Sequence, residues 1–140
     1  MSFDIFVVGI RGGENIAFDR AIVERVFRPL IDYQGQHGWG LKLPDWGPCS
    51  GFVYIDDEPQ ITNFSVNRPP FVPAFLDALF EVLCLTPTIL VWPDAPPNPS
   101  ACIANLEVFA NLSPELRASF CNPPLVSSGA EIDACVSGKA

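Results

Sequence analysis

The sequence predicts an α+β fold in which a single-layer mixed or antiparallel sheet, with one β-hairpin and one βαβ crossover, packs against helices. The hairpin is predicted because two segments rich in β-branched and aromatic residues, 51–55 and 60–67, flank the turn residues 56–59. The crossover is predicted because a helical pattern of apolar residues over 73–85 precedes the continuous apolar segment 88–92. A strand that is apolar throughout is typical of the buried centre of a sheet, which a helical connection reaches.

The N-terminal part of the chain predicts a strand followed by a helix. Residues 3–10 are rich in β-branched and aromatic side chains and are followed by Gly12-Gly13, as a strand and its loop would be. Asp19 can accept hydrogen bonds from the first free amides of a helix, and Pro29 disfavours helical geometry at Arg28. The helix is therefore expected to run from Asp19 to Arg28.

The remaining segments are expected to be shorter elements and loops. Residues 32–51 are rich in glycine and proline and predict turns, interrupted by a short strand at 41–43. Residues 94–100 predict a stiff proline-rich loop. Short helices are expected in the tail, because Ser113-Pro114 and Ser128-Gly129-Ala130-Glu131 have the pattern of helix N-termini.

The length of 140 residues favours one domain that spans 1–140. A chain that is 49% hydrophobic and 17% charged can form a core without metal ions or disulfides. Its five cysteines are odd in number and include no Cys-x-x-Cys pair, which argues against a disulfide framework and indicates a reducing compartment. No signal peptide and no apolar run near the ~20 residues of a membrane span is visible. We therefore expect a cytoplasmic protein without metal or other cofactor.

The formal net charge of −8 is unevenly distributed along the chain. Residues 1–42 carry five basic and five acidic side chains, whereas residues 43–140 carry three basic and eleven acidic ones. The excess is densest in residues 43–94, which hold one basic and seven acidic side chains. Such a field repels nucleic acids and anionic membranes and favours a basic protein partner. The alternative explanation is a solvated surface that only keeps the protein in solution.

Catalytic chemistry has few candidates in this sequence. His37 is the only histidine, so a nucleophile–base pair would have to use it, with Cys49 or Ser50 as the nearest nucleophile. The surrounding segment 47–51 lacks the strand–turn–helix order of a nucleophile elbow. The carboxylates at 56–58 could ligate a hard cation, but EF-hand spacing is absent, and a hairpin turn is the simpler interpretation. The sequence therefore predicts neither an enzyme nor a metal site.

The three tryptophans differ in their surroundings. Trp92 ends an apolar strand and is expected in the core. Trp39 and Trp46 lie in the segment rich in glycine and proline, where a tryptophan could cover the edge of the core or anchor a partner. Tryptophan is enriched in interface hot spots, so both alternatives remain at this stage.

Exposed carboxylates beside such aromatic residues predict a surface for a basic partner, because they accelerate its association. If the strands at 60–67 and 88–92 are parallel, the acidic turn at 56–58 and Asp94 lie at opposite ends of the sheet, and the turn is the firmer part of the surface. The predicted partner-binding residues are Asp45, Trp46, Asp56, Asp57, Glu58 and Asp94.

The chain also resembles a loose group of small bacterial proteins of uncharacterised function. The shared motifs are here the start Met1 to Val7, the sequence Tyr54-Ile55-Asp56-Asp57 and the sequence Trp92-Pro93-Asp94. The chain departs from the group in a longer proline-rich loop and in its five cysteines. Proteins of this kind look like immunity factors, which neutralise a toxin from a secretion or contact-inhibition system, and the resemblance implies that role.

Two functional hypotheses from different classes follow. The first is a stoichiometric protein-binding module, an immunity protein that neutralises a basic bacterial toxin through an acidic face. The second is a small hydrolase-type or metal-assisted enzyme with a carboxylate site of Asp56, Asp57 and Asp94, aided by His37. The absence of a recognisable catalytic constellation favours the first, and a toxin gene directly upstream would discriminate between them.

Overall fold

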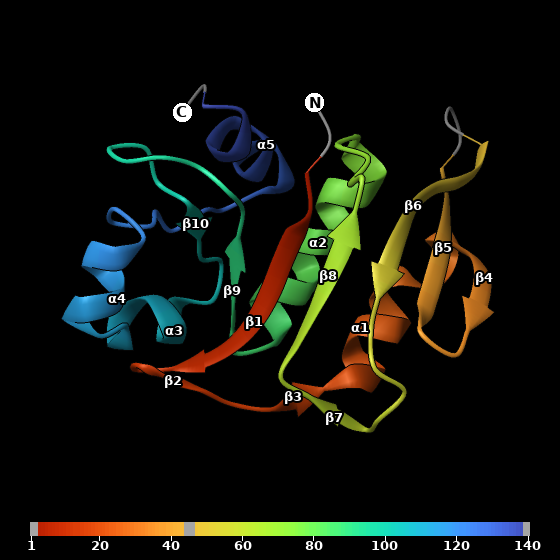
Figure 1. Ribbon diagram of the computed structural model, residues 1–140, viewed down its shortest axis with the longest axis horizontal. Coiled ribbons are helices and arrows are strands. Elements are labelled where there is room, and N and C mark those ends of the chain that lie inside the picture. The colour runs from red at the N-terminus through yellow and green to blue at the C-terminus, as the bar shows by residue number, and fades with distance from the viewer. Residues whose placement is uncertain (1–2, 44–46, 139–140) are drawn as a thin grey trace.

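The computed structural model describes residues 3–43 and 47–138, with only the backbone described for 47–50. Within these residues the centre of the molecule is an eight-stranded sheet, in which seven strands follow the order β10-β9-β1-β8-β6-β5-β4 and β2 pairs with β1 (Figure 1). A separate two-stranded sheet joins β3 and β7, and all pairs of named strands are antiparallel. The strands are β1 (Ile5–Arg11), β2 (Glu14–Asn15), β3 (Phe18–Asp19), β4 (Ile31–Gly35), β5 (Gly38–Leu43), β6 (Gly47–Tyr54), β7 (Gln60–Ile61), β8 (Asn63–Asn67), β9 (Thr88–Val91) and β10 (Ala101–Cys102).

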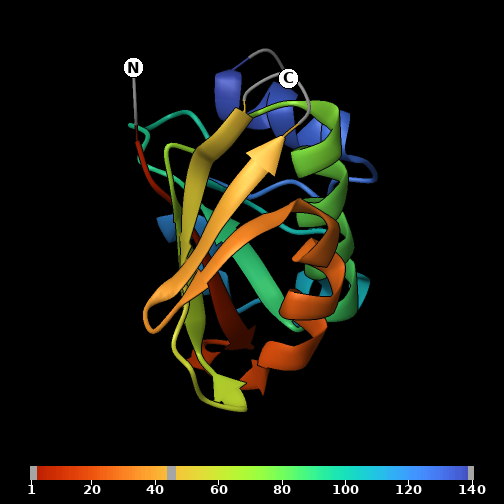
Figure 2. The same cartoon turned by 90° about the vertical axis from the view of Figure 1, so that its right-hand side faces the viewer.

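The helices cover the two faces of the sheet unequally. α1 (Arg20–Phe27), α2 (Pro73–Leu85) and α5 (Gly129–Ser137) contribute to the larger core on one face, and Figure 2 shows α1 and α2 together on that side. α3 (Leu106–Asn111) and α4 (Pro114–Ser119) belong to a smaller apolar cluster over β1, β9 and β10. The largest fully buried side chains include Trp39, Trp92, Phe27, Phe64, Phe75, Leu79 and Leu90.

The predicted α+β architecture is confirmed, including both of its motifs. β6 and β8 form the hairpin, with Val53 opposite Val66. β8 and β9 lie on either side of β1, and because both are antiparallel to β1 they are parallel to each other. α2 joins these two parallel strands, so the crossover encloses the N-terminal strand between its two halves.

The helices with predicted N-termini begin at the predicted residues. The three predicted N-cap side chains each accept a hydrogen bond from an amide of the first turn, and Pro73 is the first residue of α2. At the other end of α1 the α-helix stops at Phe27, one residue earlier than expected, and Arg28–Leu30 form a single 3-10 turn. The N-caps are Asp19, Ser113 and Ser128.

The strand predicted at 41–43 lies within β5, but the prediction of turns for the rest of residues 32–51 is wrong, because β4, the first part of β5 and the start of β6 lie there. Trp39 in β5 is buried and belongs to the core, so it cannot anchor a partner. Gly38 requires glycine: its φ is +155°, and a Cβ atom would lie 1.8 Å from the carbonyl oxygen of Val53. The Phe52 side chain lies beside Gly38, where a Cβ would be 2.9 Å from its ring. β4 and β5 therefore form because they pair with neighbouring strands, although their glycine content disfavours strand structure locally.

Candidate functional site

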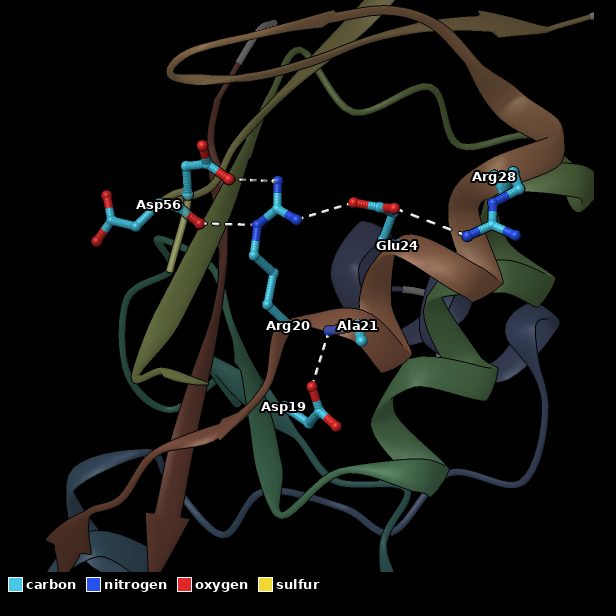
Figure 3. Close-up of polar contacts among 7 residues, drawn as sticks. Asp19, Arg20, Ala21, Glu24, Arg28 and Asp56 are labelled. Carbon is cyan, nitrogen blue, oxygen red and sulfur yellow. Dashed lines mark hydrogen bonds and ion pairs between the residues drawn. The ribbon is translucent and has the colours of Figure 1, made fainter. Parts of the chain in front are cut away.

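The predicted acidic turn, Asp56-Asp57-Glu58, connects β6 to β7, and all three residues are exposed. Arg20, the first residue of α1, holds this turn in place (Figure 3). Its Nε donates a hydrogen bond of 2.9 Å to the carbonyl oxygen of Asp56, and its backbone N–H donates one of 3.1 Å to Pro59. The turn is therefore fixed through its backbone, which leaves its carboxylates directed to solvent.

The guanidinium of Arg20 also organises the charges around the turn. It forms an ion pair of 2.8 Å with Glu24, which lies 3.7 Å from Arg28 as well, and a longer contact of 3.8 Å with Asp57. It lies over the ring of Trp39, 5.2 Å from the ring centroid. In the described part of the chain neither Asp56 nor Glu58 forms an ion pair, so two of the three carboxylates in the turn are uncompensated.

A hollow of about 480 Å³ lies beside the turn and is lined by Asp56, Ile55, Tyr54, His37, Asn63 and Ser65. The loop that carries His37 is attached here, because the Ile55 N–H donates a 3.1 Å hydrogen bond to the His37 carbonyl oxygen. A nucleophile–base pair would require the imidazole to hydrogen-bond a hydroxyl or a carboxylate. Over residues 3–43 and 51–138 no such bond of the His37 side chain is present. The side chains of the candidate nucleophiles Cys49 and Ser50 lie outside the described residues, and the hollow itself is a recessed surface with both polar and apolar walls.

The hollow continues into a sheet face that no helix of the described chain covers. This open face is the side of β4, β5, β6 and β8 turned away from α1 and α2 (Figure 2). Phe6 and Tyr54 both pair in register with Ser65, so they lie in one row across three strands, 42% and 50% exposed. The ring of Phe52 packs on Tyr54 with centroids 4.7 Å apart. Tyr33, 59% exposed on the edge strand β4, extends the aromatic surface.

The structure separates the sequence-predicted site residues. It brings Asp56, Asp57 and Glu58 together beside the open face. Asp94 follows β9 and lies at the opposite end of the sheet, as expected for parallel β8 and β9. The topology therefore does not bring Asp94 next to Asp56 and Asp57. Asp45 and Trp46 lie outside the described residues.

The exposed aromatic residues of the open face were missed by the sequence interpretation, which placed the anchors among the tryptophans. Trp92, expected in the core, is indeed buried. Among the described residues, the exposed aromatic side chains are Phe6, Tyr33 and Tyr54. The tyrosine hydroxyls could have indicated that these positions are exposed. A tyrosine in a strand has an apolar ring and a polar hydroxyl that can remain in water.

Among the described residues, no group of three or more His, Cys, Asp or Glu side chains is arranged to hold a metal ion. Nor does the described chain contain a helix that is both long and apolar enough to cross a membrane. The chain matches no protein-family model, no curated protein and no solved structure in comparisons with each.

Proposed function

We propose that this chain is a stoichiometric protein-binding module that neutralises a basic bacterial toxin in the cytoplasm, as an immunity protein does. The observation that supports this most directly is the continuity of the acidic turn with the open face. Asp56 and Tyr54 line the same hollow, so exposed carboxylates and exposed aromatic rings adjoin one another. A partner that binds one is thereby brought against the other.

The two parts of this surface have different physical roles. Aromatic side chains dominate the energy of many interfaces because they bury a large apolar area with little loss of rotamer freedom. Exposed carboxylates at the rim contribute mainly to the rate of association and to the choice of partner. The net charge of −8 adds a long-range field of the same sign. A basic protein fits both parts, whereas a nucleic acid would be repelled.

The test is protection of cells against the toxin encoded directly upstream of this chain's gene. We expect the double substitution Asp56→Lys and Asp57→Lys to reverse the charge of the turn and to abolish protection. The fold should persist, because both side chains are exposed, and thermal unfolding followed by circular dichroism checks this.

A matched control changes the total charge by the same amount elsewhere. Glu81 on α2 and Glu115 on α4 are both exposed and lie off the open face. The pair Glu81→Lys and Glu115→Lys should therefore retain protection. If the turn variant protects as well as the parent, the acidic turn does not contact the toxin. If both double variants fail equally, only total charge matters and the proposed surface is wrong.

A further inference from the structure

A second pocket, of about 470 Å³, lies at the end of the sheet opposite the acidic turn. It is enclosed by the loop 94–99, the segment 122–126 and one face of α5. Figure 1 shows the loop between β9 and β10 and the helix α5 at the same end of the molecule. Its volume is within the range of small-molecule sites, about 300–1,000 Å³.

The walls of this pocket are held by contacts that do not depend on a ligand. Residues 122–126 lie beside Ile103, which donates to the Pro124 carbonyl oxygen at 3.0 Å and accepts from the Val126 N–H at 2.8 Å. The loop 94–99 is closed at its base by a 3.0 Å hydrogen bond from the Trp92 N–H to Ser100. The pocket is therefore formed in advance, which lowers the entropic cost of binding.

α5 presents one helical face to the pocket, with Glu131, Ala134 and Cys135 at i, i+3 and i+4. The helix is fixed by its close approach to α2: a Cβ atom on Gly129 would lie 2.8 Å from the backbone of Leu76. Such proximity requires glycine at the first residue of the helix.

The pocket combines an apolar interior with a negatively charged rim. Apolar atoms come from Pro99, Pro124, Leu125, Val126 and Ala134, and the carboxylates are those of Asp94 and Glu131. Ser127 donates to Glu131 from its N–H, at 2.8 Å, and from its hydroxyl, and these bonds lower the pKa of the Glu131 carboxyl. Among the described lining residues none is Lys, Arg or His.

We propose that this pocket binds an organic cation whose ammonium group lies between Asp94 and Glu131 and whose apolar body contacts Leu125, Ala134 and Cys135. Charge complementarity selects the cation, because an anion would be repelled by Asp94 and Glu131 and a neutral molecule would form no ion pair with them. The apolar lining selects an ammonium with a hydrocarbon body over a small inorganic cation, since the hydrocarbon replaces water against these side chains. The site is independent of the toxin-binding surface, which lies at the other end of the sheet.

The test compares 4-phenylbutylamine with 4-phenylbutan-1-ol, which replaces the ammonium by a hydroxyl. Each is titrated to about 10 mM into the ¹⁵N-labelled full chain, since ligands of this size bind in the millimolar range. We expect saturable amide shifts in 122–126 and 131–135 with the amine, and at least about fivefold weaker binding of the alcohol. Equal affinities, or shifts outside these segments, would overturn the proposal.

Two substitutions examine the carboxylates separately. Asp94→Asn keeps an oxygen that can accept from the Ala95 N–H, as Asp94 Oδ1 does at 2.8 Å, and removes only the charge. Glu131→Gln likewise removes the charge of the other carboxylate and keeps a side-chain oxygen. The amide spectrum of this variant shows whether α5 remains folded. Each should weaken the amine several-fold and leave the alcohol unchanged. Unchanged affinity for the amine in Asp94→Asn would show that its charge does not contribute.

Cys135 provides a second readout that requires no substitution. Burial, followed by the charge of Glu131, raises the pKa of the Cys135 thiol, so alkylation by iodoacetamide is followed at alkaline pH. Saturating amine should slow the modification of Cys135, measured by peptide mass spectrometry. Cys84, which is exposed and outside the pocket, should react at an unchanged rate. If the two cysteines respond alike, the amine does not occupy this pocket.

Discussion

Replacement of Arg20 by alanine should destabilise the protein, because this side chain joins α1, the acidic turn and the core tryptophan Trp39. The side chain of Arg20 is only 17% exposed, and its guanidinium contacts Glu24, the Asp56 carbonyl and the Trp39 ring at once. The substitution retains the backbone bond from the Arg20 N–H to Pro59, so the turn should loosen without detaching.

The expected loss of stability follows from these contacts. A hydrogen bond from a charged donor contributes about 1.5–3 kcal/mol, and the partly exposed bond to Asp56 belongs at or below the lower limit. The helical ion pair with Glu24 adds about 0.3–0.5 kcal/mol, and the position over Trp39 about 0.5–1 kcal/mol. The contact with Asp57 adds little, since that carboxylate is 79% exposed. We expect Arg20→Ala to lower the free energy of unfolding by about 2 kcal/mol, or the melting temperature by about 7 °C.

Denaturant unfolding of three variants separates the contributions. Arg20→Met keeps the aliphatic stem and loses every polar contact, so it should be only slightly more stable than Arg20→Ala. Arg20→Lys keeps the charge, but one ammonium cannot reach Glu24 and the Asp56 carbonyl in the same geometry, so it should lose about 1 kcal/mol. If Arg20→Ala lies within about 0.5 kcal/mol of the parent, this side chain does not anchor the turn.

Further predictions concern α5 and the thiols. Gly129→Ala should cost about 1–3 kcal/mol in denaturant unfolding, since its Cβ would meet the Leu76 backbone, whereas Gly13→Ala meets a movable side chain and should stay within about 0.5 kcal/mol. Intact-mass analysis after alkylation of the unreduced, unfolded chain should find five adducts, and a shortfall of two would reveal a disulfide. The hydrogen bonds from Ser127 lower the pKa of Glu131, so the stability they contribute is present above the ordinary Glu pKa and lost as pH falls through the lowered value. Glu131→Gln should therefore be less stable than the parent at neutral pH and equal to it in acid, and an equal deficit at both would contradict this reading.

The parts of the fold that the sequence predicted are those decided by local interactions. The stripe of apolar residues in α2, the N-caps and the turn chemistry of the β6–β8 hairpin each involve residues close together in the chain. β4 and the first half of β5 escaped prediction because glycine has low strand propensity. These strands depend on the pairing of β4 with β5 and of β5 with β6, and β6 approaches Gly38 too closely for a side chain. Only the tertiary structure supplies that reason for the glycine.

The sequence analysis predicted the acidic residues of the candidate site but not its exposed aromatic residues. Asp56–Glu58 followed from turn chemistry, which places polar residues at exposed positions. Phe52-Val53-Tyr54-Ile55 is apolar on both faces, so alternation could not show which side would face water. Val53 faces the core and Tyr54 the open face because α1 and α2 cover only one side of this part of the sheet.

The free energy that the exposed aromatic residues can contribute to binding shows why the proposed surface needs the acidic turn as well. An aromatic side chain buries about 150–250 Å² when fully covered, so half-exposed Phe6, Tyr33 and Tyr54 could each bury about 100 Å² more. At about 25 cal/mol per Å² these three give a gross gain of about 7 kcal/mol. Loss of translational and rotational freedom on association costs about 4–15 kcal/mol, which removes most or all of that gain. The aromatic surface alone therefore supports only weak binding. The charges of the turn add to it mainly by accelerating association with a basic partner. Reversing the charge of the turn replaces this attraction by repulsion next to the aromatic surface, and should therefore abolish protection.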